Sequence, residues 1–244
     1  MGPRGLVEFA RGIARLIYPN ACLICDGPEA ATSGFRHGLC IQCQRAVTDD
    51  PREACVRCAA TIGPHTAAAD GCAACRAHGF RFARTLRLGE FDGRLRDAIL
   101  RMKSPRGEAL AERMGEVAAE RHASQLADTD VVVPVPLHWR RRWARGYNQA
   151  AAVAREVAAA LHRPLAGRWL RRVRAASQTE QPSASARREN IRGAFAVSRD
   201  ASLGGRRVLV VDDVMTTGAT AAEAARELLD GGAASVTVLV LARA

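Results

Sequence analysis

The chain has 244 residues and a formal net charge of +11, and 48% of its residues are hydrophobic although only 5% are aromatic. This length fits one large domain or a main domain with a small appendage, and the positive charge suits anionic partners such as phosphates, pyrophosphate or nucleic acid. No apolar run reaches the length of a membrane span, so we expect none.

The first predicted element is an amphipathic helix within residues 1–19. Its apolar residues recur at helical spacing from Leu6 to Ile17, and charged residues such as Arg11 interrupt them. A secretory signal peptide would need an uninterrupted apolar stretch, so we expect a cytoplasmic protein.

All eight cysteines lie in the next segment, residues 20–78, as four Cys-x-x-Cys pairs. The short spacing lets both sulfurs of a pair reach one ion from a tight turn, and two pairs complete a tetrahedral zinc site. If the pairs combine in sequential order, the gaps of 14 and 13 residues within the quartets are close to zinc-ribbon spacing. The two quartets are then Cys22, Cys25, Cys40 and Cys43, and Cys55, Cys58, Cys72 and Cys75. An interleaved order stays open.

Disulfides and iron–sulfur ligation are the two other uses of these cysteines. No secretory signal supports disulfides. Three histidines nearby can substitute as ligands, His37, His65 and His78, but four thiolates per ion leave them as solvated bystanders. We therefore predict a double zinc ribbon with two structural Zn2+ ions, whose filled coordination leaves no open position for catalysis.

Residues 80–244 alternate apolar strands with amphipathic helices, which predicts an α/β domain. A strand is expected over 80–88 and helices over 93–102 and 109–126. Between the helices lies Lys103, the single lysine among 36 basic residues, in a loop closed by Pro and Gly. Such a loop suits contact with an anion, although a solvated helix C-terminus that complements the helix dipole is the alternative.

An Arg-rich stretch follows a predicted strand at 130–136 and leads into a helix that runs to Leu161. From Val131 through Arg155 there are five Arg and no acid, and three aromatic residues are interleaved with them: Trp139, Trp143 and Tyr147. This composition fits single-stranded nucleic acid through charge and stacking. The favoured interpretation is that the Trp residues pack and that the start of the helix contacts the substrate at the carboxyl edge of the sheet. The residues expected there are Arg145, Gly146, Asn148 and Gln149.

Short strands are expected over 169–173 and 193–197. The polar segment between them, 174–188, has little to bury, and a loop of this length inside a compact domain is usually functional or disordered. Two of its last residues are Arg187 and Arg188. A simple exposed linker is the alternative.

The most informative stretch runs from Val208 to Thr220. An apolar run over 207–212 predicts a buried parallel strand that ends in two carboxylates, Asp212 and Asp213. A hydroxyl-rich turn follows, and then a helix is expected over 221–229 and a last strand over 235–242. The turn consists of Thr216, Thr217, Gly218, Ala219 and Thr220. Backbone N–H groups of such a turn can bind one phosphate, and the carboxylates can reach sugar hydroxyls or a metal held by the ligand.

This stretch resembles the phosphoribosyl-pyrophosphate (PRPP) motif of type I phosphoribosyltransferases. Three further motifs narrow the resemblance to the ComF competence-protein family, and the double zinc ribbon agrees with it. These motifs are Phe91-Asp92-Gly93, Val133-Pro134-Val135-Pro136-Leu137-His138 and Arg145-Gly146-Tyr147-Asn148-Gln149-Ala150. The resemblance covers nearly the whole chain from Cys22 onward.

The resemblance implies a type I phosphoribosyltransferase fold over 80–244, with a central, mainly parallel sheet, flanking helices and a flexible hood near 174–188. It implies that Asp212 and Asp213 hold the ribose hydroxyls and Mg2+, and that the turn at 216–220 holds the 5′-phosphate. Pyrophosphate would lie at Lys103, Arg187 and Arg188. The implied reaction transfers ribose 5-phosphate from PRPP to a nucleophile and releases pyrophosphate.

A second class of function stays open, because the sequence contains no recognisable general base or acceptor pocket. A non-catalytic protein of this kind would bind PRPP, or another phosphorylated ribose, as a sensor. ComF proteins are associated with competence and DNA uptake. The resemblance therefore implies single-stranded DNA or a helicase as a partner of the zinc ribbons and the Arg-rich loop.

Overall fold

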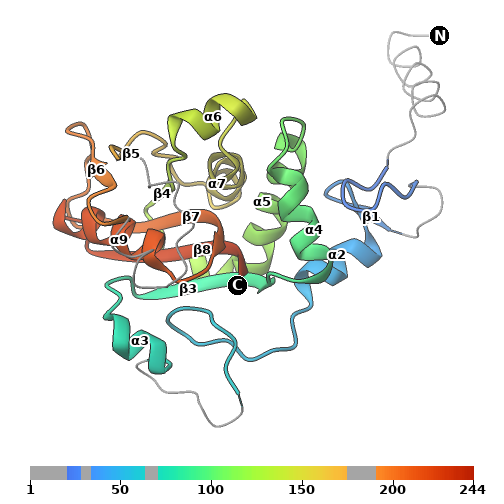
Figure 1. Ribbon diagram of the computed structural model, residues 1–244, viewed down its shortest axis with the longest axis horizontal. Helices are drawn as coiled ribbons and strands as arrows, with labels where there is room; N and C mark the ends of the chain where they lie inside the picture. The colour runs from blue at the N-terminus through green and yellow to red at the C-terminus, as the bar shows by residue number, and fades with distance from the viewer. Residues whose placement is uncertain (1–20, 29–33, 64–70, 175–190) are drawn as a thin grey trace.

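The computed structural model describes residues 21–28, 34–63, 71–174 and 191–244, and its centre is a four-stranded sheet (Figure 1). The strand order is β3-β8-β7-β4, and all neighbours run parallel. The strands are β3 (Arg84–Glu90), β8 (Ser235–Arg243), β7 (Arg207–Met215) and β4 (Val131–Pro134). The predicted α/β architecture with a parallel sheet is confirmed, and the strand of the acidic pair lies inside the sheet between β8 and β4.

Helices cover both faces of the sheet, which explains why its strands are apolar on both sides. On one face, α4 (Gly93–Met102), α5 (Glu108–His122) and α7 (Gln149–Ala160) pack against Leu209 and Val211 of β7. On the other face, α9 (Ala219–Asp230) packs against Val208 and Val210. Successive residues of a strand point to opposite faces. The two aspartates that follow in β7 therefore face different helices.

The remaining connections differ in part from expectation. The predicted strand at 193–197 is β6 (Phe195–Val197), which pairs antiparallel with β5 (Leu170–Arg172) in a separate two-stranded sheet. The Arg-rich stretch contains a helix of its own, α6 (Trp139–Arg145), and α5 gives way to a 3-10 turn, η2 (Ser124–Leu126). The helix expected within 1–19 and the residues Arg187 and Arg188 lie outside the described ranges. Among the helices that are described, none has the length and apolar character needed to cross a membrane.

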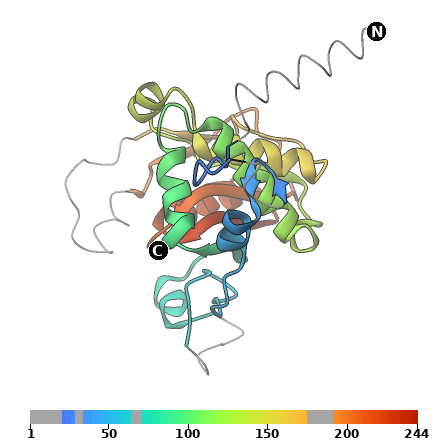
Figure 2. The same ribbon diagram turned by 90° about the vertical axis from the view of Figure 1, so that its right-hand side faces the viewer.

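The cysteine-rich segment forms two small modules that join the apolar clusters on opposite faces of the sheet. In Figure 1 the first lies beside α4 and the second lies beyond the edge strand β3, and Figure 2 shows the same separation. The first contains the strands β1 (Phe35–Arg36) and β2 (Leu39–Cys40) and the helix α2 (Ile41–Thr48). Its buried residues belong to the same apolar cluster as those of α4 and α5. The second contains α3 (Ala73–His78) and joins the core on the α9 face.

Candidate phosphate site and cysteine tetrads

The acidic pair lies within β7, which continues to Met215, rather than at the end of the strand as expected. Asp213 is buried, with 8% of its surface exposed, and turns toward the face that carries α4 and α7. Its Oδ2 accepts a hydrogen bond of 3.0 Å from Nε2 of Gln149 and lies 3.5 Å from Nζ of Lys103. The structure thus brings together three of the predicted site residues from distant parts of the chain.

Lys103 is the C-cap residue of α4, and its contact with Asp213 places it beside the C-terminal end of β7. Its Nζ lies 5.9 Å from the centroid of the Phe91 ring, which provides a cation–π contact. The Lys103 side chain remains 30% exposed. A cation that is held beside the acidic pair and still reaches solvent is available to a phosphate group of a ligand.

Asp212 turns to the other face and lines a small hollow of about 40 Å³ together with Thr216, Thr217 and Thr220. Its Oδ1 accepts a hydrogen bond of 2.9 Å from the backbone N–H of Asp213. Burial raises the pKa of Asp212 well above its ordinary value, and the charge of Asp213 raises it further, against the opposing effect of Lys103. A neighbouring cation would restore the charged form.

The turn after β7 forms the rest of this hollow. Gly218 adopts the left-handed conformation, with φ +77°, and α9 begins at the next residue. The amide of Ala219 donates to Oγ1 of Thr217 at 3.3 Å, and Ala222 is the first to donate to a helical carbonyl, that of Gly218. The start of α9 thus presents backbone N–H groups and the positive end of the helix dipole to the hollow, which is the environment that binds phosphate.

The predicted residues at the start of α7 have unequal roles. Asn148 is the N-cap: its Oδ1 accepts from the amide of Ala150 at 3.1 Å, and its Nδ2 donates to the carbonyl of Val135. Gln149 is buried and binds Asp213, and within the described residues its Oε1 has no hydrogen-bond partner. Arg145 ends α6 and Gly146 follows with φ +81°, and neither lines the hollow at the turn. Gln149 is therefore the member of this group that the structure joins to the acidic pair.

The aromatic residues of the Arg-rich stretch do not all pack. Tyr147 is buried, and its hydroxyl donates to the carbonyl of Met102. Trp139 and Trp143, one helical turn apart on α6, are 66% and 87% exposed. The expectation that the Trp residues pack is wrong, because α6 lies at the outer margin of the described chain (Figure 1) and both indoles stay exposed.

The cysteines fall into two tetrads in sequential order, Cys22, Cys25, Cys40 and Cys43, and Cys55, Cys58, Cys72 and Cys75. Within each tetrad all four sulfurs lie within 4.8 Å of one another, and the closest pairs are 3.7 Å to 3.9 Å apart. Four sulfurs about 2.3 Å from a central zinc ion would be about 3.8 Å from each other. The geometry fits zinc and not disulfides, whose sulfurs are about 2.05 Å apart.

The backbone around each tetrad favours ionisation of one of its thiols. Burial opposes ionisation of Cys55, but the backbone amides of Cys58, Arg57 and Cys72 lower its pKa to about 6. In the first tetrad burial again opposes ionisation, and the amides of Cys40, Cys25 and Ile24 lower the pKa of Cys22 to about 7. Burial and neighbouring thiols raise the pKa of Cys43, Cys58 and Cys75, so one thiol of each tetrad is the one that most readily takes the thiolate form that binds metal.

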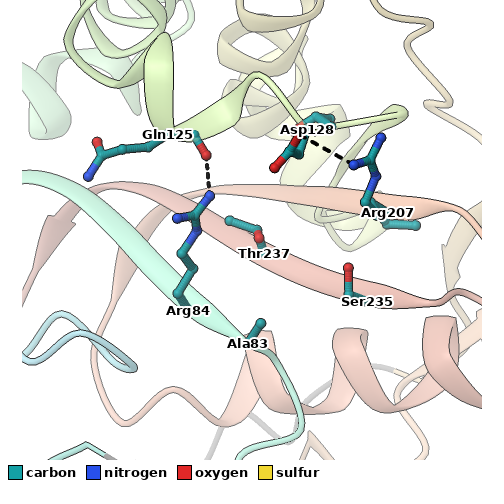
Figure 3. Close-up of a pocket in the computed structure, with 9 residues that line it drawn as sticks. Ala83, Arg84, Gln125, Asp128, Arg207, Ser235 and Thr237 are labelled. Carbon is teal, nitrogen blue, oxygen red and sulfur yellow. Dashed lines mark hydrogen bonds and ion pairs between the residues drawn. The ribbon is translucent and has the colours of Figure 1, made fainter. Parts of the chain in front are cut away.

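A larger hollow, of about 370 Å³, lies at the opposite edge of the sheet, where the parallel strands begin (Figure 3). Two arginines line it, Arg84 and Arg207. Arg84 donates to the carbonyl of Gln125, and Arg207 pairs with Asp128 at 3.4 Å and with Asp130 at 2.9 Å. Because the chain itself satisfies both cations, we assign no ligand to this hollow.

A parallel sheet whose interior strand carries two aspartates and runs into a helix N-terminus defines the class of the protein: it has a type I phosphoribosyltransferase fold. The model of the family described as "Phosphoribosyl transferase domain" matches residues 108–244. The chain is 31% identical to DNA utilization protein YhgH of Escherichia coli K12 over 233 residues, which cover 93% of this chain and 99% of that protein. It is 30% identical to competence protein F of Haemophilus influenzae over 216 residues, 86% of this chain and 92% of that protein.

The chain therefore belongs to the phosphoribosyl transferase domain family and, within it, to the ComF group that contains YhgH and competence protein F. A solved structure, the glutamine PRPP amidotransferase from B. subtilis complexed with ADP and GMP, is similar at 25% identity and a TM-score of 0.39, over 55% of this chain and 27% of that chain.

Proposed function

We propose that this protein binds PRPP with Mg2+ and transfers its ribose 5-phosphate to a nucleophile with release of pyrophosphate. The observation that carries the proposal is the ion pair of Lys103 with Asp213, on the strand that leads into the turn at the start of α9. A cation, two carboxylates and a helix N-terminus match the three chemical parts of PRPP. Membership of the phosphoribosyl transferase domain family supports the same ligand.

Each part of the ligand has a place on the chain. The turn from Thr216 to Thr220 would hold the 5′-phosphate through backbone amides and threonine hydroxyls. Asp212, which shares the hollow with this turn, would accept hydrogen bonds from the ribose hydroxyls. Lys103 would hold the pyrophosphate. Arg187 and Arg188, outside the described residues, are proposed to add charge there.

The chemistry needs positioning and charge stabilisation more than covalent participation. The bond between C1 and the pyrophosphate oxygen breaks with its electron pair going to oxygen, and the nucleophile then bonds to C1. Lys103 stabilises the charge that grows on the leaving oxygen, and the turn at 216–220 fixes the ribose by its phosphate. Mg2+, held through Asp212 and Asp213, would neutralise part of the pyrophosphate charge.

We also propose that each cysteine tetrad holds one structural Zn2+, since four sulfurs at these distances complete a tetrahedral site. Metal analysis of the purified chain tests this: the expected content is about two zinc ions per chain. Replacing one ligand of each tetrad, Cys25→Ser with Cys72→Ser, should release both.

The test of the main proposal is equilibrium dialysis with PRPP and Mg2+, in wild type and in Asp212→Asn/Asp213→Asn. Binding by the wild type and its loss in the variant are expected. Asp128→Asn is the matched control, because this aspartate is 85% exposed at the opposite edge of the sheet. No binding by the wild type would contradict the proposal. Pyrophosphate release in a screen of nucleobases and amines then separates a transferase from a non-catalytic sensor.

A second function is favoured by one observation, the exposure of Trp139 and Trp143 on a segment with four arginines and no acid between residues 137 and 147. We propose that this surface of α6 binds single-stranded DNA, with the bases stacked on the indoles and the phosphates neutralised by arginine. The names of the relatives, which refer to DNA utilization and competence, agree with this ligand.

Fluorescence anisotropy with a labelled oligothymidylate tests this surface. Trp139→Ala/Trp143→Ala should weaken binding by at least about tenfold, since stacking contributes about 1–3 kcal/mol per base. Arg140→Gln/Arg142→Gln should weaken it and flatten its dependence on salt. The exposed Leu100→Ala on α4 is the control for loss of an apolar side chain. Equal affinity of the Trp variant and the wild type would contradict the proposal.

A further inference from the structure

The second cysteine module contacts the turn that holds the proposed phosphate site, and one arginine makes the connection. Arg243 is the last residue of β8 and lies opposite Met215 in the parallel pair of β7 and β8. Its Nε donates to the carbonyl of Cys58 at 3.2 Å, and its Nη1 donates to the carbonyl of Met215 at 3.1 Å. Cys58 belongs to the second tetrad, and Met215 directly precedes the turn.

The carbonyl of Met215 is held at two points. It accepts the guanidinium of Arg243 and, at 2.9 Å, the backbone amide of Ala244. Because the peptide plane of Met215 sets the direction in which the chain leaves β7, these bonds fix the entry to the turn that begins at Thr216. A turn whose amides must converge on one phosphate depends on such an entry.

The second module also contacts the middle of the same turn. Phe80, which follows α3 closely in sequence, is buried, and a Cβ atom placed on Gly218 would lie 3.1 Å from its ring. Phe80 is stacked on Phe82 at a centroid distance of 4.8 Å, and its carbonyl accepts a hydrogen bond from Arg57. Arg57 lies between Cys55 and Cys58, inside the first Cys-x-x-Cys turn of the second tetrad; we call such a turn a knuckle. The knuckle is therefore joined to the entry and to the middle of the turn.

We propose that Arg243 is a positioning residue that couples the metal-loaded second tetrad to the phosphate-binding turn. Four thiolates around an ion give the knuckle one conformation and hence give the carbonyl of Cys58 one position. Without the ion no bond holds the four sulfurs together, so the carbonyl of Cys58 loses its fixed place and Arg243 no longer holds Met215 in the geometry for phosphate. The state of this tetrad then controls the affinity of a site that contains none of its cysteines.

The first tetrad supplies a matched control. Arg101 binds its knuckle in the same manner, through a hydrogen bond of 3.3 Å from Nη1 to the carbonyl of Leu23. This arginine belongs to α4, however, and has no contact with the turn in the described residues. If loosening any knuckle disturbs the turn, Arg101→Met and Arg243→Met should both change it. If the coupling runs through Arg243, only Arg243→Met should change it.

The experiment measures amide hydrogen exchange of peptides covering 214–222 in the full chain, together with calorimetry using ribose 5-phosphate as the probe. Exchange in these peptides should be about tenfold faster in Arg243→Met, and ribose 5-phosphate should bind about tenfold more weakly, as expected for the loss of a hydrogen bond from a charged donor. Arg243→Lys should recover part of both, because the ammonium can still reach one carbonyl. Arg101→Met should leave both unchanged.

The metal arm compares Cys72→Ser with Cys25→Ser, which each remove one half-buried ligand from a different tetrad. Cys72→Ser should accelerate exchange over 214–222 and Cys25→Ser should not. Unchanged exchange over 214–222 in Arg243→Met would overturn the inference, even if a cysteine variant fails to fold. The affinity measurement rests on the proposed function, but the exchange measurement does not. If the wild type fails to bind ribose 5-phosphate, the proposed function is contradicted, and the exchange data still decide whether Arg243 couples the tetrad to the turn.

Discussion

The two cysteine modules share a ligand set but are attached to the rest of the molecule by different physics. The first meets α4 and α5 partly through exposed ion pairs, such as Arg101 with Asp26, whose side chains are 45% and 68% exposed. The second is joined to the sheet through Arg87, whose side chain is only 5% exposed and donates to the carbonyl of Ala59 at 2.7 Å and to Oγ1 of Thr61 at 3.0 Å. The same spacing of cysteines thus gives one module that covers helices and another that supports the carboxyl edge of the sheet.

The largest expected effect is on the buried attachment. Arg87 donates to the buried carbonyl of Ala59, to Thr61 and to Asp50, so Arg87→Met leaves the Ala59 carbonyl without this donor and breaks a nearly buried ion pair. We expect a loss of about 3 kcal/mol in the free energy of unfolding by urea, even though Arg52 still pairs with Asp50. Arg101→Met should cost less than about 1 kcal/mol because its ion pair is exposed. Equal losses would remove the distinction between the two attachments.

A second prediction tests the contact between the second module and the turn. Gly218→Ala forces a side chain into the left-handed region at φ +77° and against the ring of Phe80. We expect a loss of about 1–2 kcal/mol in stability and at least about tenfold weaker binding of PRPP. Gly167→Ala is the control, since no atom lies within 4 Å of its added Cβ. Full PRPP affinity in Gly218→Ala would show that the turn does not depend on this contact.

A third prediction uses the two faces of the acidic pair, of which Asp212 lies on the side of the second module. Burial, with the charge of Asp213, raises the pKa of Asp212 from 3.8. Protonation competes with Mg2+, so the affinity for PRPP with Mg2+ should increase by up to about tenfold per pH unit as pH rises through the raised pKa. Calorimetry across about pH 5 to pH 8 measures this slope. Asp212→Asn should abolish the slope, and a slope that survives the substitution would assign it to another group.

The stability of the unliganded protein should depend on pH in the opposite direction to the affinity. Folding favours the neutral carboxyl, so its contribution to stability is complete below the unfolded-state pKa, near 3.8, and is lost as pH rises through the raised pKa. Asp212→Asn should therefore be more stable than the wild type at neutral pH, as measured by urea unfolding. A less stable variant would contradict the raised pKa.

The smallest effect is expected at the first module. His37 bridges Glu116 at 2.7 Å and Glu120 at 3.0 Å on α5, with Glu120 45% exposed. His37→Asn keeps a residue that tolerates the observed φ of 53° and should cost less than about 1 kcal/mol. Urea unfolding measures it. A loss comparable with that of Arg87→Met would show that the first module carries as much of the stability as the second.

Much of this molecule follows from local sequence pattern. The apolar runs predict β4, β7 and β8, and Asp212 and Asp213 with the following turn predict the phosphate site, because these features depend on neighbours along the chain. The knuckle spacing predicts the cysteine tetrads for the same reason.

The contacts between distant segments could not be predicted. Nothing local in the sequence distinguishes Arg243 from the many other arginines, and its role follows only from the register that places it opposite Met215. The sequence predicts Gln149 near the ligand, but its hydrogen bond to Asp213 joins segments that lie far apart in the chain. The exposure of Trp143 likewise depends on whether another element covers α6, and the hydrophobic pattern of the segment does not predict this.

The central claim, that the acidic pair and the following turn bind PRPP, is tested most directly by a crystal structure of the protein with PRPP and Mg2+. The account predicts the 5′-phosphate on the amides of residues 216–220, the ribose hydroxyls at Asp212 and the pyrophosphate beside Lys103. PRPP bound elsewhere, for example between Arg84 and Arg207 at the opposite edge of the sheet, would contradict it, as would crystals that bind no PRPP at saturating concentration.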